Sequence, residues 1–321
     1  MHSLDDLGQL FTEKFAIGHF PETPASLYDP NRYFLNLGGK RIRPLLVLMG
    51  NELVDDIHDD SWLVANAVEL FHNFTLIHDD IMDEAPLRRG QETVHSKYGP
   101  NTALLAGDVM LVKAYDYLIS VKQDYARQII TLFNRTAAEV CEGQQIDMDF
   151  EKRPDVSLEE YLHMIQLKTS VLLAASLKMG AIIGGASRYN QDHLYQFGLN
   201  LGTAFQVQDD YLDAFGDPAK FGKEVGGDIR QNKKTFLAIH TWELATASQR
   251  GRLEELATSY DASKVSEVLS IMKACGVDEW AKQLKEEYYK KAIFHLEEIA
   301  VMSRRKVALS ELAQFLLQRE Y

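Results

Sequence analysis

Apolar residues recur every three to four positions along almost the whole chain, and this spacing constrains the fold more than any other feature. The stretch that leads to residue 79 is an example, with Ala65, Val68, Leu76 and Ile77 in helical spacing and no Gly or Pro between them. A period of 3.6 places such residues on one face of an α-helix. Strict alternation over the length of a strand is hard to find, so the sequence predicts an all-α fold.

Helix boundaries can also be read from local signals. The eight prolines are expected between helices or in a helix's first turn, where a missing N–H costs little. Among the expected helices are one over residues 4–15 and one that Ser157 and Glu160 open as a capping box. No linker divides the 321 residues, so we expect a single domain over residues 1–321.

Composition narrows the class of protein. The net charge of −13 argues against a nucleic-acid partner, which needs an extended basic face. Cys141 and Cys275 cannot build a disulfide framework and are expected to be small core residues, which fits a reducing cytoplasm. The N-terminus is acidic, and the most apolar run, residues 171–186, is too short to span a bilayer. We expect a cytoplasmic protein without a transmembrane segment.

Three aspartates close the helix that leads to residue 79. Asp79 and Asp83 are one helical turn apart and Asp80 is three residues from Asp83, so the three carboxylates can converge at one end of one face. An isolated pattern of this kind is usually solvated surface. Here the approach is too apolar for a surface face.

Two arginines follow the aspartates. Pro86 is expected to turn the chain so that Arg88 and Arg89 return over the acidic end. Arginine forks suit bidentate contacts with phosphate oxygens, and carboxylate clusters suit hard divalent cations that also hold phosphates. The region therefore has the residue types of one half of a reaction centre.

The same acidic pattern occurs a second time. From Tyr189 a long apolar helical pattern runs into Asp209, Asp210 and Asp213. Two such endings in one chain argue for a shared metal and phosphate chemistry.

Cations and polar residues elsewhere have two readings each. Lys40, Arg41 and Arg43 follow two glycines and are either a solvated basic turn or a phosphate site. The glycine-rich stretch 215–228 carries lysines and is either an exposed connector or a lid over phosphates. Lys168 lies in an apolar series, and its ammonium either belongs to the same site or extends to the surface. Gln144 and Asp147, which could support a metal shell, more simply form a polar helix end.

With both aspartate motifs, the Gly-Gly-Lys-Arg loop and the paired arginines in place, the chain resembles the trans-type polyprenyl synthetases, also called isoprenyl diphosphate synthases. The resemblance covers nearly the whole chain in order and spacing. It implies a single-domain isoprenoid synthase fold with helices around a deep central cavity, usually as a homodimer. The implied reaction joins isopentenyl diphosphate to an allylic diphosphate, which could be the dimethylallyl, geranyl or farnesyl compound.

The resemblance also implies roles for individual residues. The magnesium ligands, for three ions when diphosphate is bound, would be Asp79, Asp80, Asp83, Asp209, Asp210 and Asp213. The cations on the allylic diphosphate would be Arg88, Lys168, Lys223 and Lys233, although the sequence does not separate Lys233 from Lys234. The metal-free pocket for isopentenyl diphosphate would be Lys40, Arg41, His72 and Arg89, while Thr169 and Gln206 would face the reacting carbons.

Product length depends on the residues before the first motif. In the family, bulky side chains four and five residues before the first aspartate form a floor, and these positions are Thr75 and Phe74. Threonine should let the chain pass, whereas Phe74 is a partial floor or a core residue. With the two-residue spacer of the first motif, this favours C20 geranylgeranyl diphosphate first and C15 farnesyl diphosphate second. A floor from the helix expected over residues 100–121 is the alternative.

Other functions share parts of this pattern. A longer-chain polyprenyl diphosphate synthase would keep every motif, and a non-catalytic regulatory subunit would keep the fold. A terpene cyclase would not need the second cationic pocket. A helical metal phosphohydrolase could use His78 and Asp79 as ligands but would need more histidines at suitable positions.

Overall fold

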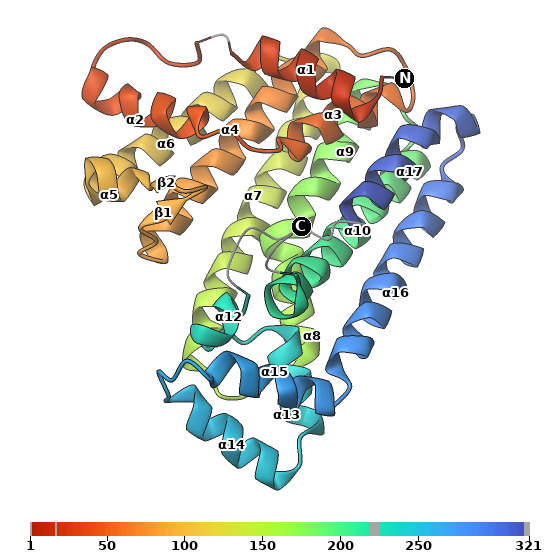
Figure 1. Cartoon of the computed structure of the whole chain (residues 1–321). Helices are drawn as coiled ribbons and strands as arrows, with labels where there is room; N and C mark the ends of the chain where they lie inside the picture. The colour runs from red at the N-terminus through yellow and green to blue at the C-terminus, as the bar shows by residue number, and fades with distance from the viewer. Residues whose placement is uncertain (1, 17, 218–224, 318–321) are drawn as a thin grey trace. The chain divides into compact units, whose positions relative to one another are not determined.

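The computed structural model describes residues 2–16, 18–217 and 225–317, and these are helical nearly throughout (Figure 1). The helices are α1 (Leu4–Phe15), α2 (Ala25–Asn36), α3 (Ile42–Glu52), α4 (Asp59–Met82), α5 (Val94–Tyr98), α6 (Pro100–Leu118), α7 (Gln123–Lys152), α8 (Leu158–Ile165), α9 (Val171–Ile183), α10 (Arg188–Phe215), α12 (Gly227–Arg230), α13 (Phe236–Leu244), α14 (Ala247–Ala257), α15 (Lys264–Ala274), α16 (Val277–Glu298) and α17 (Ser303–Leu317). A π-helical turn, η1 (Gln166–Ser170), lies between α8 and α9. The predicted all-α class is confirmed.

The chain divides into two compact units. Unit 1 comprises Met1–Asn134, Ser176–Gln191 and Val301–Ala308. Unit 2 comprises Arg135–Ala175, Asp192–Ala300 and Leu309–Tyr321. Each unit contains its own cluster of buried apolar side chains. The single domain over the whole chain stays a prediction.

In unit 1, α4 packs along α6 and against α3. Near its start, the carboxylate of Asp60 accepts hydrogen bonds from the backbone N–H of Lys122 and from the hydroxyl of Tyr125. Near its end, Ile77 is fully buried beside Phe34 of α2. Both ends of α4 are thus held, and the aspartates that close it are presented on a fixed helix.

In unit 2, the predicted capping box opens α8. The hydroxyl of Ser157 accepts from the backbone N–H of Glu160, and the Glu160 carboxylate accepts from the backbone N–H of Ser157 at 2.9 Å. Helices α13 and α15 pack against α16, and α14 packs against α15, so the three short helices gather at one end of this unit (Figure 1). The end of α10 with the second aspartate motif belongs to the same unit.

Three local expectations were wrong. Strands β1 (Leu87–Arg88) and β2 (Gln91–Glu92) form a small antiparallel hairpin, which is too short to leave an alternating pattern. Pro30 lies inside α2, where burial of its ring offsets the lost backbone hydrogen bond. Cys141 is exposed, because successive helical residues point about 100° apart and the preceding Val140 takes the buried face of α7.

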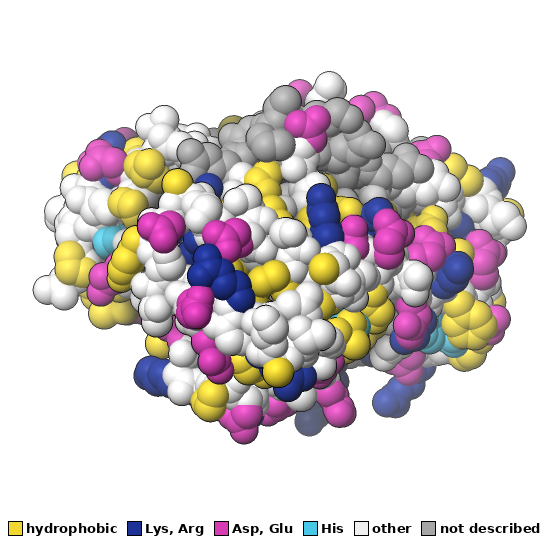
Figure 2. All heavy atoms as spheres, turned by 60° about the horizontal axis from the view of Figure 1, so that its bottom comes forward, with side chains coloured by type: hydrophobic (Ala, Val, Ile, Leu, Met, Phe, Trp, Pro, Cys, Tyr) yellow, Lys and Arg dark blue, Asp and Glu magenta, His cyan; other side chains and the backbone are white. Residues whose placement is uncertain are grey.

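One helical run, Leu158–Ile183, is long and apolar enough to cross a membrane, because α8, η1 and α9 continue one another. Within the protein, 78% of its most apolar window is buried, as in the core helix of a water-soluble domain. The space-filling view shows acidic and basic side chains interspersed over one face of the molecule, and no extended basic surface is visible among the described residues there (Figure 2).

Candidate active site

The first aspartate motif lies at the C-terminal end of α4. Asp79 and Asp80 are in the last turn, and Asp83 is the residue that caps the helix. Asp80 is almost completely buried, with 1% of its surface exposed, whereas Asp83 is exposed. The three carboxylates therefore differ in environment although they share one helix end.

Arg88 returns over this acidic end, as predicted. Its Nε donates to both carboxylate oxygens of Asp80 at 2.9 Å, and its Nη2 lies 2.8 Å from Asp80 and 3.7 Å from Asp79. Burial raises the pKa of Asp80, and the guanidinium of Arg88 acts in the opposite direction. An arginine that already pairs with a buried carboxylate is placed to exchange it for a phosphate group.

Arg89 faces a different set of groups, although it is the next residue. Arg89 and Gly90 form the two-residue turn of the hairpin, and both have positive φ, 54° and 76°. The guanidinium of Arg89 lies against Gly39, where a Cβ atom would come within 2.7 Å of Nη2. Glycine at position 39 thus makes room for Arg89, and any larger residue there would displace it.

A polar cluster lies close to Arg89. Arg43 donates from Nη1 to Nε2 of His72 at 3.1 Å. Burial, followed by the positive charges of Arg43 and Arg89, holds the pKa of His72 well below its ordinary value, so the imidazole is neutral. Glu69 is buried and accepts from the amide of Asn73 at 3.0 Å. We call Arg43, Glu69, His72 and Arg89 the arginine pocket.

Two buried atoms of the arginine pocket have no hydrogen-bond partner among the described residues, namely Nε of Arg43 and Oε2 of Glu69. Burial lowers the pKa of Arg43 to about 10, and Glu69 acts against this shift, so the guanidinium stays charged near neutral pH. A buried charged donor without an acceptor is costly. The Nε donor of Arg43 is therefore suited to an incoming anion, whereas Oε2 of Glu69 is suited to a hydrogen-bond donor.

Lys40 and Arg41 were predicted for this pocket beside His72. Lys40 is exposed. Arg41 has a positive φ of 47°, and its guanidinium lies over the ring of Phe15 at 4.6 Å. Arg43 is therefore the arginine of this loop that contacts His72. The role of Arg41 in substrate binding stays a prediction.

The second motif is built differently. Asp210 is buried, and it accepts from the hydroxyl of Tyr161 at 2.5 Å and from the amide of Gln206 at 2.9 Å. Thr169 in turn donates to Gln206 at 3.5 Å. Burial raises the pKa of Asp210 to about 7, against the effect of the Tyr161 hydrogen bond. Asp209, by contrast, is exposed.

Lys168 lies in the π-helical turn η1 and pairs with Asp147 at 2.6 Å. Gly143 of α7 faces this turn, and a Cβ atom there would lie only 2.3 Å from the backbone nitrogen of Lys168. Glycine is required for this close approach of two backbones. The lysine thus does not simply reach out to the surface, and Asp147 is more than a polar helix end.

Asp213 of α10 contacts the first turn of α12. It accepts from the backbone N–H of Asp228 at 3.0 Å, and Asp228 pairs with Lys233 at 3.3 Å. Lys234 instead donates to the backbone carbonyl of Phe150 at 2.9 Å. Of the two neighbouring lysines, Lys233 therefore lies with the acidic residues. Lys223 falls outside the described residues.

The carboxylate groups of both motifs are chemically suited to magnesium. Among residues 2–16, 18–217 and 225–317, no three His, Cys, Asp or Glu side chains are gathered into a preformed metal site. Magnesium does not require one, because it commonly binds one or two carboxylates together with waters and substrate phosphates. The carboxylate oxygens of Asp79, Asp80, Asp209 and Asp210 are of the kind that magnesium prefers.

The two residues predicted to set product length are both half-buried. Thr75 donates its hydroxyl to the backbone carbonyl of His72 at 2.8 Å. The ring of Phe74 lies 5.7 Å from that of Phe71 and 4.7 Å from that of His78, beside the buried cluster of unit 1. Phe74 therefore serves at least as a core residue.

The sequence did not identify three residues of the site. Glu69 interrupts an apolar helix three residues before His72, and this interruption was the available signal. Tyr161 gave no signal, since an aromatic residue in an apolar helix is ordinary core. Asp228 lies in the glycine-rich stretch, but its contact with Asp213 depends on how the chain turns.

Comparison with known proteins gives a consistent result. A sequence model that describes the polyprenyl synthetase family matches residues 24–275. The chain is 39% identical over 300 residues to the short chain isoprenyl diphosphate synthase of Methanothermobacter thermautotrophicus, with 93% of this chain and 92% of that protein covered. It is 38% identical over 301 residues to the geranylgeranyl diphosphate synthase of Sulfolobus acidocaldarius, with 91% of each covered. A crystal structure of a geranylgeranyl pyrophosphate synthase matches with a TM-score of 0.94 at 45% identity and 100% coverage of both chains.

Proposed function

The chain belongs to the polyprenyl synthetase family and is a prenyltransferase, and on this premise we propose that it joins isopentenyl diphosphate to an allylic diphosphate to give geranylgeranyl diphosphate as the main product. Farnesyl diphosphate is the second candidate product.

The observation that carries the proposal is the separation of two neighbouring arginines. Arg88 pairs with the carboxylates of the first motif, and Arg89 lies with the arginine pocket. A condensation of two diphosphates needs one to leave and the other to stay intact. Arg88, beside the acidic ligands, suits the departing diphosphate, and Arg89 suits the diphosphate that is kept.

The chemistry accounts for the residue types. Breaking the allylic carbon to oxygen bond leaves a carbocation and a free diphosphate, and the barrier falls when preorganised positive charge meets the leaving group. Arg88, Lys168 and Lys233 supply such charge from the protein. When bound, magnesium would add Lewis-acid stabilisation of the same leaving group, held by the six aspartates of the two motifs.

Isopentenyl diphosphate is better bound without metal. Arg43 and Arg89 offer guanidinium donors, and neutral His72 adds no charge that would need neutralising. The double bond of this substrate is then left to attack the cation, and loss of a proton from the adduct gives the lengthened product. Thr169 is hydrogen-bonded to Gln206, and Gln206 in turn donates to Asp210. We assign Thr169 and Gln206 to the reacting carbons.

The test is a product assay. Purified protein is incubated with magnesium, isopentenyl diphosphate and dimethylallyl, geranyl or farnesyl diphosphate, and the dephosphorylated products are identified by chromatography and mass. A C20 alcohol as main product supports the proposal. Products beyond C25 would indicate a longer-chain synthase. A cyclic hydrocarbon product would indicate a terpene cyclase. The absence of turnover with every substrate would indicate a regulatory subunit.

We also propose a homodimer. On α6, Leu105 and Val112 are 55% and 62% exposed, and Ile119 at its end is 67% exposed. They recur every seven residues and form an apolar stripe, which a second copy would cover. Analytical ultracentrifugation should give a dimer, and Val112→Glu should give a monomer. A wild-type monomer at micromolar concentration would contradict this assignment. A cytoplasmic location stays a prediction that cell fractionation can test.

A further inference from the structure

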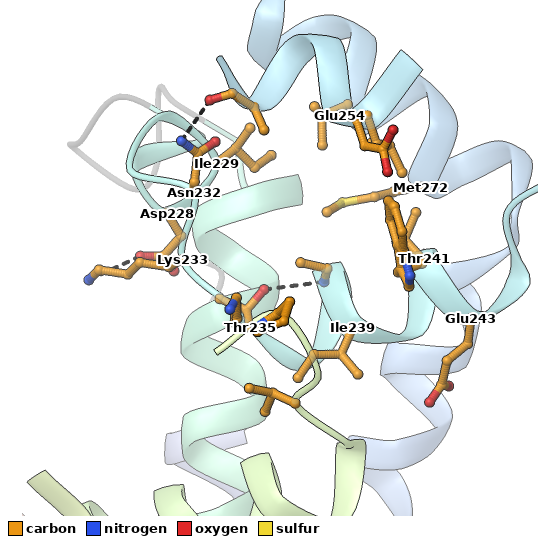
Figure 3. A pocket seen from close by; sticks show the side chains of 18 of the residues that line it. Asp228, Ile229, Asn232, Lys233, Thr235, Ile239, Thr241, Glu243, Glu254 and Met272 are labelled. Atoms are coloured by element: carbon orange, nitrogen blue, oxygen red, sulfur yellow. Dashed lines mark hydrogen bonds and ion pairs between the residues drawn. The ribbon is translucent and has the colours of Figure 1, made fainter. Parts of the chain in front are cut away.

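A cavity of about 620 Å³ lies in unit 2 among α12, α13, α14 and α15 (Figure 3). We call it the α15 cavity. Its volume is in the range of small-molecule sites, which is about 300–1,000 Å³. Apolar side chains form much of its wall, and these include Ile239 and Trp242 of α13, Leu253 of α14, and Val268 and Met272 of α15. Figure 3 shows Met272 reaching into the space.

Lys264 gives the α15 cavity a polar end. It lines the cavity and is 94% buried, since 6% of its surface is exposed. Its ammonium donates to the backbone carbonyl of Arg230 at 3.4 Å, which is a long hydrogen bond. A buried ammonium normally requires an ion pair or several hydrogen bonds. Lys264 therefore has donors to offer a ligand.

The other charged side chains around the cavity limit the ligand's charge. The lining holds three lysines and four carboxylates, which are Lys233, Lys234, Lys264, Asp155, Asp228, Glu243 and Glu254. Lys233 pairs with Asp228, and in Figure 3 it turns away from the space. Lys234 donates to a backbone carbonyl. With a net charge of −1, the lining would repel a diphosphate but can accept one negative charge at Lys264.

The length of the apolar wall sets the size of the ligand. Lys264, Val268 and Met272 line the cavity from successive turns of α15. At about 1.5 Å per residue, Met272 lies about 12 Å along the helix from Lys264. An alkyl chain of about ten carbons fits this length.

We propose that the α15 cavity binds an apolar monocarboxylate, with the carboxylate on the ammonium of Lys264 and the chain along Val268, Met272 and Trp242. The site is separate from the proposed diphosphate sites, except that Asp228 and Lys233 lie on its rim. It is therefore testable without any measurement of prenyl transfer.

Decanoate is the probe, and decanol has the same chain without the charge. We expect saturable binding of decanoate to the whole protein by calorimetry, below its micelle concentration, with a change in Trp242 fluorescence. Lys264→Met should weaken decanoate binding about tenfold or more and leave decanol unchanged, because it removes a charged hydrogen bond. Lys290→Met, on the exposed surface of α16, is the matched control and should change neither.

A second variant keeps the test decisive if Lys264→Met unfolds. Ala238→Phe places a ring in the cavity and should abolish binding of both probes, while circular dichroism reports an intact fold. Equal affinity for decanoate and decanol, binding unaffected by both variants, or no binding to the wild type would overturn the proposal. Displacement of decanoate by isopentenyl diphosphate would also overturn it, because the probe would then occupy a substrate site.

Discussion

The two aspartate motifs have the same sequence pattern but different electrostatic surroundings. In the first, buried Asp80 is paired with a cation, Arg88. In the second, buried Asp210 is hydrogen-bonded to two neutral groups, the hydroxyl of Tyr161 and the amide of Gln206. Burial raises the pKa of both carboxyl groups. At Asp80 the guanidinium of Arg88 opposes this shift, whereas at Asp210 only neutral hydrogen-bond donors oppose it. The first motif thus has a positive counter-charge from the protein, whereas the second would obtain one only from a bound cation.

This difference suggests that the two motifs bind their metal ions in different ways. Under the proposed function, an incoming diphosphate would pair with the guanidinium of Arg88 at the first motif, and the carboxylates of Asp79 and Asp80 would then be available to a metal ion. At the second, a metal ion would ionise Asp210 as it binds, since metal binding to a carboxyl group releases its proton. The predictions below test whether the two motifs differ in this way.

The largest effect is expected from neutralising either motif. Asp79→Asn and Asp210→Asn should each lower turnover by about 10²–10³-fold, because each removes a charge that organises the stabilisation of the leaving group. Steady-state assays over a range of magnesium concentrations measure this, and extra magnesium should restore little. Near-normal turnover in either variant would show that its motif is not part of the reaction centre.

The next largest effect is expected from substitutions of Arg88 and Arg89, which should affect different substrates. Arg89→Ala should weaken isopentenyl diphosphate binding by one to two orders of magnitude, since a charged hydrogen bond is worth about 1.5–3 kcal/mol. The apparent affinity for the allylic substrate should move less. Arg88→Ala is the matched variant and should show the reverse preference. An equal loss for both substrates in both variants would refute two separate diphosphate sites.

Product length should depend on the first motif's helix. Thr75→Phe should shorten the main product, and Phe74→Ala should lengthen it, because the two changes add and remove a ring one turn before Asp79. Chromatography of the dephosphorylated products measures the shift, and Ile183→Leu, a conservative change in α9, serves as the control. If both variants keep the wild-type distribution, the floor is formed by other residues, and α6 is the first place to look.

The smallest effect concerns stability in the absence of metal. Because the pKa of Asp210 rises from 3.8 to about 7, the folded protein keeps a proton that the unfolded chain releases between these values. The retained proton contributes to the free energy of unfolding. This contribution is complete below pH 3.8, is lost as the pH rises to 7, and amounts to a few kcal/mol by the linkage relation. Asp210→Asn should remove this part of the pH dependence.

Thermal melting in EDTA between pH 5 and 8 measures the last effect. The melting temperature of Asp210→Asn should rise relative to that of the wild type as the pH increases. The melting temperature of Asp209→Asn, a change at an exposed position, should not. Parallel curves for the wild type and Asp210→Asn would show that Asp210 is ionised in the metal-free protein.

Helical spacing was sufficient to predict the class of fold, because helices such as α1 bury an apolar face, and α1 begins and ends where the pattern does. It also placed the aspartates and the return of Arg88. The hairpin was not predictable, since two-residue strands carry no periodicity.

Direction of side chains in the cationic loop could not be read from sequence either. The resemblance implied Arg41 for the isopentenyl diphosphate pocket, and this role stays a prediction. In the structure the Arg41 guanidinium lies over the ring of Phe15, whereas Arg43 contacts His72. Partners distant in sequence were equally hidden. Tyr161 and Asp210 are 49 residues apart, and only the packed structure makes them neighbours.

The turn formed by Arg89 and Gly90 has a consequence for how this family can evolve. A two-residue hairpin turn with positive φ at both positions prefers Asn before Gly, and a longer side chain such as arginine is strained there. Under the proposed function, arginine at this position lowers local stability in exchange for a contact with isopentenyl diphosphate. Selection for thermal stability alone would favour asparagine, so the persistence of arginine would mark a lineage that still needs the second diphosphate.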